Sequence, residues 1–229
     1  MTSIVDNFDK VRARIATACA AAGRSVEAVE LVAVSKRHPA AAVTAASATG
    51  HLVFGENRVQ ELASKAAELG AGAGLQWHLI GSLQTNKVRD LARVPGLSLI
   101  HSCDRKKLAS ALQREFEGRP EPLGVLLQVN ATGESQKHGC AVEDAPSLLE
   151  HLLADCPSLS VRGLMAMGPL EGASRPVFDR VAALQEDLRR RSGLELATLS
   201  MGMSGDLDDA IAAGSTMVRV GTALFGPRA

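Results

Sequence analysis

Tyrosine is absent from the 229-residue sequence, and aromatic residues make up only 3% of it. The lack of tyrosine removes one of the side chains that enzymes use for general acid–base catalysis. The sequence also lacks any run of about 18 apolar residues, so we expect no membrane-spanning helix. Residues 1–6 show no basic segment followed by an apolar run, and we therefore expect no secretory signal.

Cysteine pairs and an excess of charge are also missing. The four cysteines are scattered and include no C-x-x-C pair, which argues against a disulfide framework or a zinc site and favours a reducing cytoplasm. Lys plus Arg equals Asp plus Glu, at 25 each. A formal net charge of zero gives no overall field for nucleic acid, so we expect no nucleic-acid partner. The scattered cysteines also lead us to expect no metal.

The first 22 residues predict a helix that precedes the rest of the fold. Ile4, Phe8, Val11 and Ile15 recur at helical spacing and form one apolar face. Helix formers continue to residue 22, and Gly23 is suited to end the helix. We expect this helix over about residues 3–22.

After this helix, short apolar segments alternate with helical segments eight times. Mostly apolar strands that do not alternate with polar residues are typical of a parallel sheet buried on both faces. Eight such units predict one (β/α)₈ barrel domain over residues 1–229, as in TIM-type barrels. An open doubly wound sheet is the alternative, although no glycine-rich dinucleotide motif follows the first strand. The expected strands are 30–35, 51–54, 76–80, 97–100, 123–130, 159–162, 196–199 and 216–219, and the expected helices are 39–48, 56–69, 84–93, 105–117, 142–153, 175–191, 207–213 and 222–225.

Lys36 follows directly after the first apolar strand. In a barrel of this class the carboxyl ends of the strands form the active-site face, so the side chain is expected in the mouth. Burial and nearby cations such as Arg58 or Arg219 would lower the pKa of the amine and favour Schiff-base chemistry. The alternative is a lysine that extends into solvent.

The ends of the last two strands predict a phosphate site. Ser204 and Gly205 open one helix, and Gly221 and Thr222 open the next. Free backbone N–H groups, two hydroxyls and glycines make an anion site, and barrels often bind phosphate there. Ordinary helix capping is the alternative.

Further polar residues near the strand ends have less specific patterns. Arg219 would point into the mouth as a pure hydrogen-bond donor, or else form a salt bridge with Asp206 or Glu56. Met203 could contact a ligand, whereas we expect the other methionines of these segments to pack in the barrel. Gln84, Asn86 and Lys87 either face the mouth or cap a helix. His51, His101 and His138 show no metal-ligand spacing and are expected to be structural or surface residues.

Six segments together resemble the pyridoxal phosphate homeostasis protein family. They are LVAVSK (31–36), FGENRVQE (54–61), WHLIGSLQTNK (77–87), GLMAM (163–167), LSMGMSGD (199–206) and VRVGT (218–222), which span nearly the whole chain. The resemblance implies a barrel like the N-terminal domain of alanine racemase.

The resemblance also implies a cofactor and the residues that bind it. These are pyridoxal 5′-phosphate (PLP) held covalently on Lys36, phosphate held around Ser204, Gly221 and Thr222, Arg219 at the pyridine nitrogen, and Asn57 near the ring. Arg37 and His38 depart from the family pattern, in which a smaller polar residue and a lysine follow the reactive lysine.

The resemblance indicates a protein that acts in vitamin B6 homeostasis. An arginine at the ring nitrogen makes PLP a weaker electron sink, and no tyrosine is available as a second acid–base group. We therefore expect a protein that buffers PLP or delivers it to apo-enzymes, without turnover. We also expect a monomer, because the helical segments show no large exposed apolar patch. The alternative is a weak amino-acid racemase that uses Lys36 with His78, His101 or Cys103. A third hypothesis is a phosphate-binding barrel enzyme without PLP.

Overall fold

The computed structural model describes residues 3–134 and 136–227. In these residues eight parallel strands form a ring in the order β4-β3-β2-β1-β9-β8-β7-β5, and the pairing of β4 with β5 closes it. The two-residue strand β6 adds to β5 outside the ring. The strands are β1 Glu30–Val34, β2 Val53–Glu56, β3 Gln76–Leu79, β4 Leu97–Cys103, β5 Leu123–Asn130, β6 Cys140–Ala141, β7 Leu159–Met165, β8 Thr198–Ser200 and β9 Met217–Val220.

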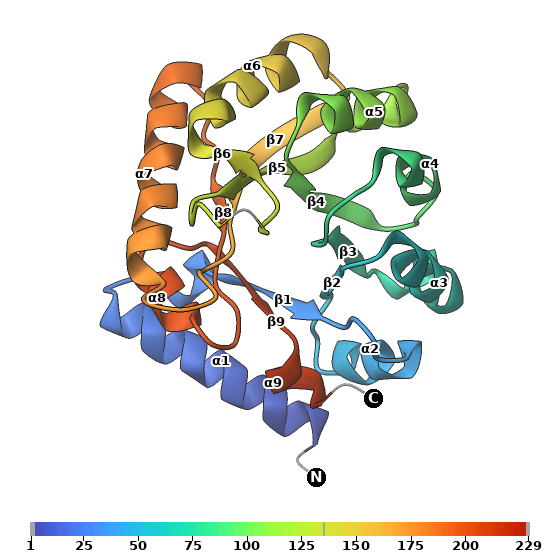
Figure 1. Ribbon diagram of the computed structural model, residues 1–229. Helices are drawn as coiled ribbons and strands as arrows, with labels where there is room; N and C mark the ends of the chain where they lie inside the picture. The colour runs from blue at the N-terminus through green and yellow to red at the C-terminus, as the bar shows by residue number, and fades with distance from the viewer. Residues whose placement is uncertain (1–2, 135, 228–229) are drawn as a thin grey trace.

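Helices surround the ring of strands (Figure 1). They are α1 Ile4–Ala21, α2 Ala40–Ser47, α3 Val59–Leu69, α4 Val88–Leu91, α5 Lys106–Phe116, α6 Ala145–Asp155, α7 Arg175–Ser192, α8 Leu207–Ala212 and α9 Thr222–Phe225, with 3₁₀ turns at Val26–Ala28, Ala71–Ala73, Thr85–Lys87 and Val142–Asp144. None of the helices in the described ranges combines the length and apolar character that a membrane crossing requires.

The closed ring confirms the predicted (β/α)₈ barrel, and the open-sheet alternative is wrong. Several strand bounds differ from the prediction, because it followed apolar runs alone. Strand β2 covers residues 53–56 instead of 51–54, and β4 and β7 each continue three residues further than expected. The extension of β4 brings His101 and Ser102 into the strand, where both are fully buried.

The barrel interior contains an apolar layer and a polar layer. A separate cluster of buried side chains comes from five different strands: Val32, Leu99, Leu126, Met165 and Met217. Side chains of this kind fill the interior of a small barrel. The polar layer consists of the buried side chains of His78, His101, Ser200 and Arg219, which are joined by hydrogen bonds. The interior is therefore packed, and one polar end of it faces the mouth.

Helix α1 lies against α8 and α9 (Figure 1). Ser3 and Asp6 form a capping box at its start, where each side chain accepts a hydrogen bond from the other residue's backbone N–H. Phe8, Val11 and Ile15 of the predicted apolar face are buried. Since α8 and α9 follow the last two strands, α1 supports the loops that form one side of the mouth.

Candidate functional site

A cavity of about 390 Å³ opens at the carboxyl ends of the strands. Its volume falls in the range of roughly 300–1,000 Å³ that is usual for small-molecule sites. All seven residues predicted to bind the cofactor lie in its wall: Lys36, Asn57, Met203, Ser204, Arg219, Gly221 and Thr222. They come from the ends of β1 and β2, from β9, and from the loops after β8 and β9, so the fold brings together segments that are far apart in the sequence.

Lys36 follows β1 at a backbone turn that is fixed on both sides. The preceding residue, Ser35, is fully buried, and its carbonyl accepts a hydrogen bond from Lys65 Nζ at 2.7 Å. The following residue, Arg37, has a φ of 62°, a left-handed conformation that is uncommon without glycine. The Arg37 N–H donates to Glu61 Oε1. Lys36 is half-buried and lines the cavity wall.

A buried ion pair beneath this turn was not expected from the sequence. Lys65 Nζ lies 2.6 Å from Glu56 Oε1 and 2.9 Å from Glu61 Oε1, and Glu56 also accepts a hydrogen bond from Ser35 Oγ at 2.7 Å. Burial raises the pKa of Glu56, while the hydrogen bonds from Lys65 and Ser35 act in the opposite direction. Helix α3 thereby ties the ends of β1 and β2 together next to Lys36.

The loops after β8 and β9 place hydroxyl and backbone donors at the cavity. Within the described ranges, no acceptor is recorded for the backbone N–H of Ser204, Gly205 or Thr222. Helix α8 begins after Asp206 and has no side-chain cap, so the alternative of Ser204 as an ordinary cap is wrong. Asp206 Oδ1 instead accepts from the Met203 N–H at 2.7 Å. Donors without internal acceptors next to small residues are suited to hold a phosphate.

Helix α1 holds both of these loops from behind. Arg14 Nη1 donates to the Ser204 carbonyl at 2.6 Å, and the same guanidinium pairs with Asp208. Asn7 Nδ2 donates to the Leu224 carbonyl at 2.9 Å. The N-terminal helix therefore fixes the two loops relative to each other.

Arg219 lies at the inner end of the cavity and is 4% exposed. Its Nη1 donates to Ser200 Oγ at 2.5 Å and its Nη2 to the Ala166 carbonyl at 3.0 Å. Burial lowers the pKa of Arg219 to about 10, which leaves the group protonated at neutral pH. Among the described residues no salt bridge of Arg219 is recorded, and Glu56 pairs with Lys65, so the salt-bridge alternative is wrong.

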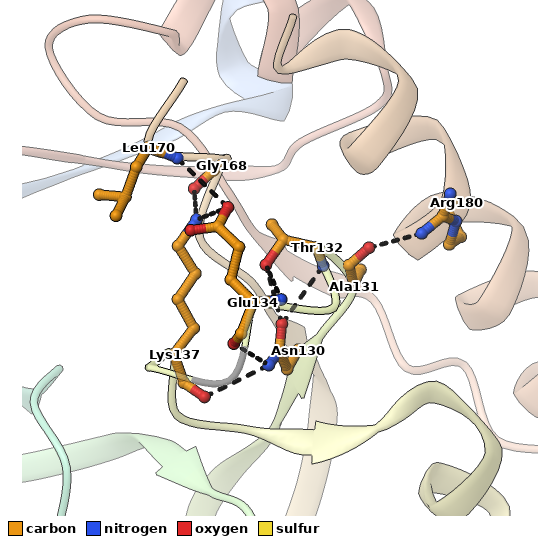
Figure 2. A network of polar contacts seen from close by, with 8 residues as sticks. All are labelled: Asn130, Ala131, Thr132, Glu134, Lys137, Gly168, Leu170 and Arg180. Atoms are coloured by element: carbon orange, nitrogen blue, oxygen red, sulfur yellow. Dashed lines mark hydrogen bonds and ion pairs between the residues drawn. The ribbon is translucent and has the colours of Figure 1, made fainter. Parts of the chain in front are cut away.

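The loop from β5 to β6 brings His138 to the cavity wall. Figure 2 shows how this loop is held: Lys137 Nζ contacts Glu134 Oε1 at 2.9 Å and the Gly168 carbonyl at 2.6 Å, and the Asn130 side chain donates to the Glu134 carbonyl. Arg180 of α7 donates to the Ala131 carbonyl. His138 was expected to be structural or on the surface. It is exposed, as expected, and it also lines the same cavity as Lys36, which the sequence did not predict.

The sequence did not predict several other residues of the cavity wall. Met165 packs in the barrel interior as expected, and it also lines the cavity together with Met167, Gln128 and Ile80. Gln128 donates to the His138 carbonyl at 3.0 Å. A stronger signal was available for Gln128, because it is the one polar residue in the apolar run 123–129.

A second, wider cavity of about 930 Å³ adjoins the first and shares Asn57, Ser82 and His138 with it. Gln84 and Lys87 line it, and neither Gln84 nor Lys87 forms a side-chain cap for the helical turn that starts there.

Within the described residues no cluster of His, Cys, Asp and Glu suited to a metal is present, and all four cysteines are free thiols.

Comparison with known proteins relates this chain to PLP-binding barrels. The family model described as alanine racemase, N-terminal domain matches residues 7–229. A Pseudomonas aeruginosa protein named pyridoxal phosphate homeostasis protein is 48% identical over 228 residues, which cover 100% of this chain and 97% of the relative.

Solved structures agree with this relationship. The structure of PipY from Synechococcus elongatus with PLP bound is 35% identical, with a TM-score of 0.84, over 98% of this chain and 100% of that one. Alanine racemase from Corynebacterium glutamicum, at 18% identity and a TM-score of 0.69, shares the fold over 96% of this chain and 61% of its own. The chain belongs to the pyridoxal phosphate homeostasis protein family, within the larger family of alanine racemase N-terminal domains.

Proposed function

We propose that this protein binds PLP as a Schiff base on Lys36 and acts in vitamin B6 homeostasis by buffering the cofactor or delivering it. One observation carries the proposal. The seven residues that the sequence singled out as the PLP site converge on one cavity of suitable volume, in a member of a family with a PLP-bound structure.

The residues present fit the two ends of this cofactor. Ser204, Gly205 and Thr222 offer donors for a phosphate, and Arg219 can only donate, as an unprotonated pyridine nitrogen requires. Lys36 supplies an amine in the same cavity. When bound, PLP supplies an aldehyde that condenses with amines and a ring that withdraws electrons.

We assign no turnover to this site, because the groups considered for a second acid–base role lie elsewhere. His78 and His101 are buried below the cavity, and neither lines it. Cys103 is fully buried, and burial raises the pKa of its thiol far above the ordinary range. Proton transfer needs a group within hydrogen-bond reach of the reacting atom.

One observation favours the alternative of a weak amino-acid racemase. His138 lines the cavity together with Lys36, so an imidazole and an amine are both present there. Racemisation predicts exchange of the α-hydrogen of an amino acid with deuterium from the solvent, and that exchange would be lost in His138→Gln. The buffering role predicts no such exchange in either protein.

The remaining features of the proposal concern the protein in the cell. Residues 1–229 act as one domain and as a monomer, in a reducing cytoplasm, with transient contacts to apo-enzymes that accept PLP. A delivery role predicts that loaded protein activates a PLP-dependent apo-enzyme faster than the same concentration of PLP released by dilution.

A spectroscopic titration tests the proposal. PLP added to the wild-type protein is expected to give the visible absorption band of a Schiff base, which Lys36→Ala loses. Lys107→Ala, at an exposed position on α5, is the matched control and should keep the band. An absent band in the wild type, or an unchanged band in Lys36→Ala, would contradict the proposal.

A further inference from the structure

Behind Arg219, three buried side chains form a continuous set of hydrogen bonds across the barrel interior. Ser200 Oγ contacts Arg219 Nη1 at 2.5 Å and His101 Nδ1 at 3.0 Å. His101 Nε2 lies 3.1 Å from His78 Nδ1. Ser200 and His101 are 0% exposed and His78 is 4% exposed. We call Ser200, His101 and His78 the interior chain; it links strands β8, β4 and β3.

The chemistry of Arg219 sets the direction of every hydrogen bond in the interior chain. A guanidinium has only donors, so Ser200 Oγ accepts from Arg219. The serine hydrogen then needs an acceptor, and His101 Nδ1 is the one recorded within reach among the described residues. His101 therefore carries its proton on Nε2 and donates it to His78 Nδ1. In the reverse direction the buried serine hydroxyl would lose its acceptor, which is unfavourable.

The surroundings keep both imidazoles neutral, as this direction requires. Burial lowers the pKa of His78 to about 4. Burial, together with the charges of His78 and Arg219, lowers the pKa of His101 well below its ordinary value. At neutral pH each ring holds one proton, so the hydrogen bonds have a single consistent arrangement that starts at the Arg219 donor and ends at His78.

We propose that Ser200, His101 and His78 are positioning residues that lock the Arg219 guanidinium as a donor toward the pyridine nitrogen of the cofactor. The proposal rests on the proposed PLP-binding function. Two of the five N–H donors of Arg219 are used by Ser200 and the Ala166 carbonyl, which hold the guanidinium in the cavity wall and leave its other donors available to a ligand. A fixed donor at that nitrogen keeps the ring unprotonated, which suits a protein that holds PLP without turnover.

The first test uses the protein without cofactor, so its result is independent of PLP binding. Nitrogen-15 NMR of histidine-labelled protein near neutral pH should show His101 protonated on Nε2 and unprotonated on Nδ1. In Ser200→Ala, His101 loses the hydroxyl that selects this tautomer, and the bias should weaken or reverse. A wild-type His101 that is charged or protonated on Nδ1 would overturn the proposal.

The second test measures what the interior chain does for the cofactor. Ser200→Ala and His101→Phe should weaken PLP binding by about tenfold or more, since a hydrogen bond to a charged group is lost. Both should also change the pH dependence of the visible band of bound PLP. His51→Phe is the control, because His51 is buried away from the cavity and bonds to the Val53 carbonyl.

The outcomes separate this proposal from the proposed function. Wild-type affinity and an unchanged pH profile in Ser200→Ala would overturn the positioning role while leaving PLP binding intact. A wild-type protein that does not bind PLP would refute the proposed function, and the tautomer would still report on the interior chain. If His101→Phe fails to fold, Ser200→Ala decides the question, since it removes only one buried oxygen.

Discussion

Removal of the Lys65 ammonium tests how much the ion pair beneath Lys36 contributes to the fold. In Lys65→Met the apolar part of the side chain is kept, but Glu56 remains fully buried without its cation, and the Ser35 carbonyl loses its donor. Breaking a buried ion pair by removing one partner costs about 3–5 kcal/mol. A protein of this size loses about 2–4 °C in Tm per kcal/mol, so we expect a decrease of roughly 6–20 °C.

The loss should depend on pH with a defined sign. Burial raises the pKa of Glu56, and loss of Lys65 raises it further. Below the pKa of an unfolded glutamate, about 4.3, the carboxyl is neutral in the folded and the unfolded state, and the variant loses little stability. As the pH rises through the folded-state pKa, the unpaired carboxylate becomes charged inside the protein, and the stability falls.

Thermal unfolding followed by circular dichroism from about pH 5 to about pH 8 measures both effects. Lys107→Met, exposed on α5, is the matched control. The double variant Glu56→Gln/Lys65→Met removes both charges and should regain part of the stability at the higher pH. If Lys65→Met unfolds at the same temperature as Lys107→Met across this range, the reasoning about the buried pair is wrong.

Three further predictions concern the cavity and the barrel interior. In Gly81→Ala the added Cβ would lie 2.2 Å from the Asn57 carbonyl oxygen, so Asn57 must move. We expect the PLP affinity of this variant to fall about tenfold in a binding titration. Gly72→Ala, whose added Cβ faces open space, is the control and should bind PLP as the wild type does. Arg14→Ala should lower PLP affinity several-fold, because Arg14 holds the Ser204 carbonyl. Its free energy of unfolding should change by less than about 1 kcal/mol, because the ion pair of Arg14 with Asp208 is exposed. Equal PLP affinity in wild type and variant would exclude a role of α1 in the site. Because the pKa values of His78 and His101 are lowered in the folded protein, the unfolded state takes up protons first, and the free energy of unfolding should fall as the pH drops from about 6.5 toward 4. Denaturant titrations of His78→Phe should show a shallower fall. The same slope in wild type and variant would refute the claim that His78 is buried as a neutral imidazole.

The sequence predicted the barrel, and it predicted residues that line one cavity, because both follow from local patterns. Apolar strands alternating with helices specify the ring, and the strand ends specify where polar side chains meet. Lys36, Arg219 and the loops at Ser204 and Gly221 needed only this rule to be placed in one cavity. The roles of these residues toward PLP stay predictions until they are measured.

The parts that were missed depend on contacts between distant segments. His101 interrupts an apolar run, so the strand was ended before it, although a polar side chain can be buried inside a barrel when it has partners such as Ser200 and His78. Lys65 shares a helix face with the buried Val59, Leu62 and Ala66. That position on the apolar face of a helix could have predicted a buried lysine with an acidic partner.

His138 had no comparable sign in the sequence. Its position comes from the loop between β5 and β6, which is held by Lys137 and the Gly168 carbonyl (Figure 2). No periodicity marks such a loop, and its path depends on contacts with the segment after β7. Its approach to the cavity therefore required the structure.

The most direct test of the central claim is to reduce the PLP-loaded protein with borohydride and locate the modified residue by peptide mass spectrometry. The account predicts a pyridoxyl group on Lys36 at near-complete occupancy, and none there in Lys36→Ala. A pyridoxyl group found mainly on another lysine, such as Lys87 or Lys137, or the absence of any modification, would contradict it.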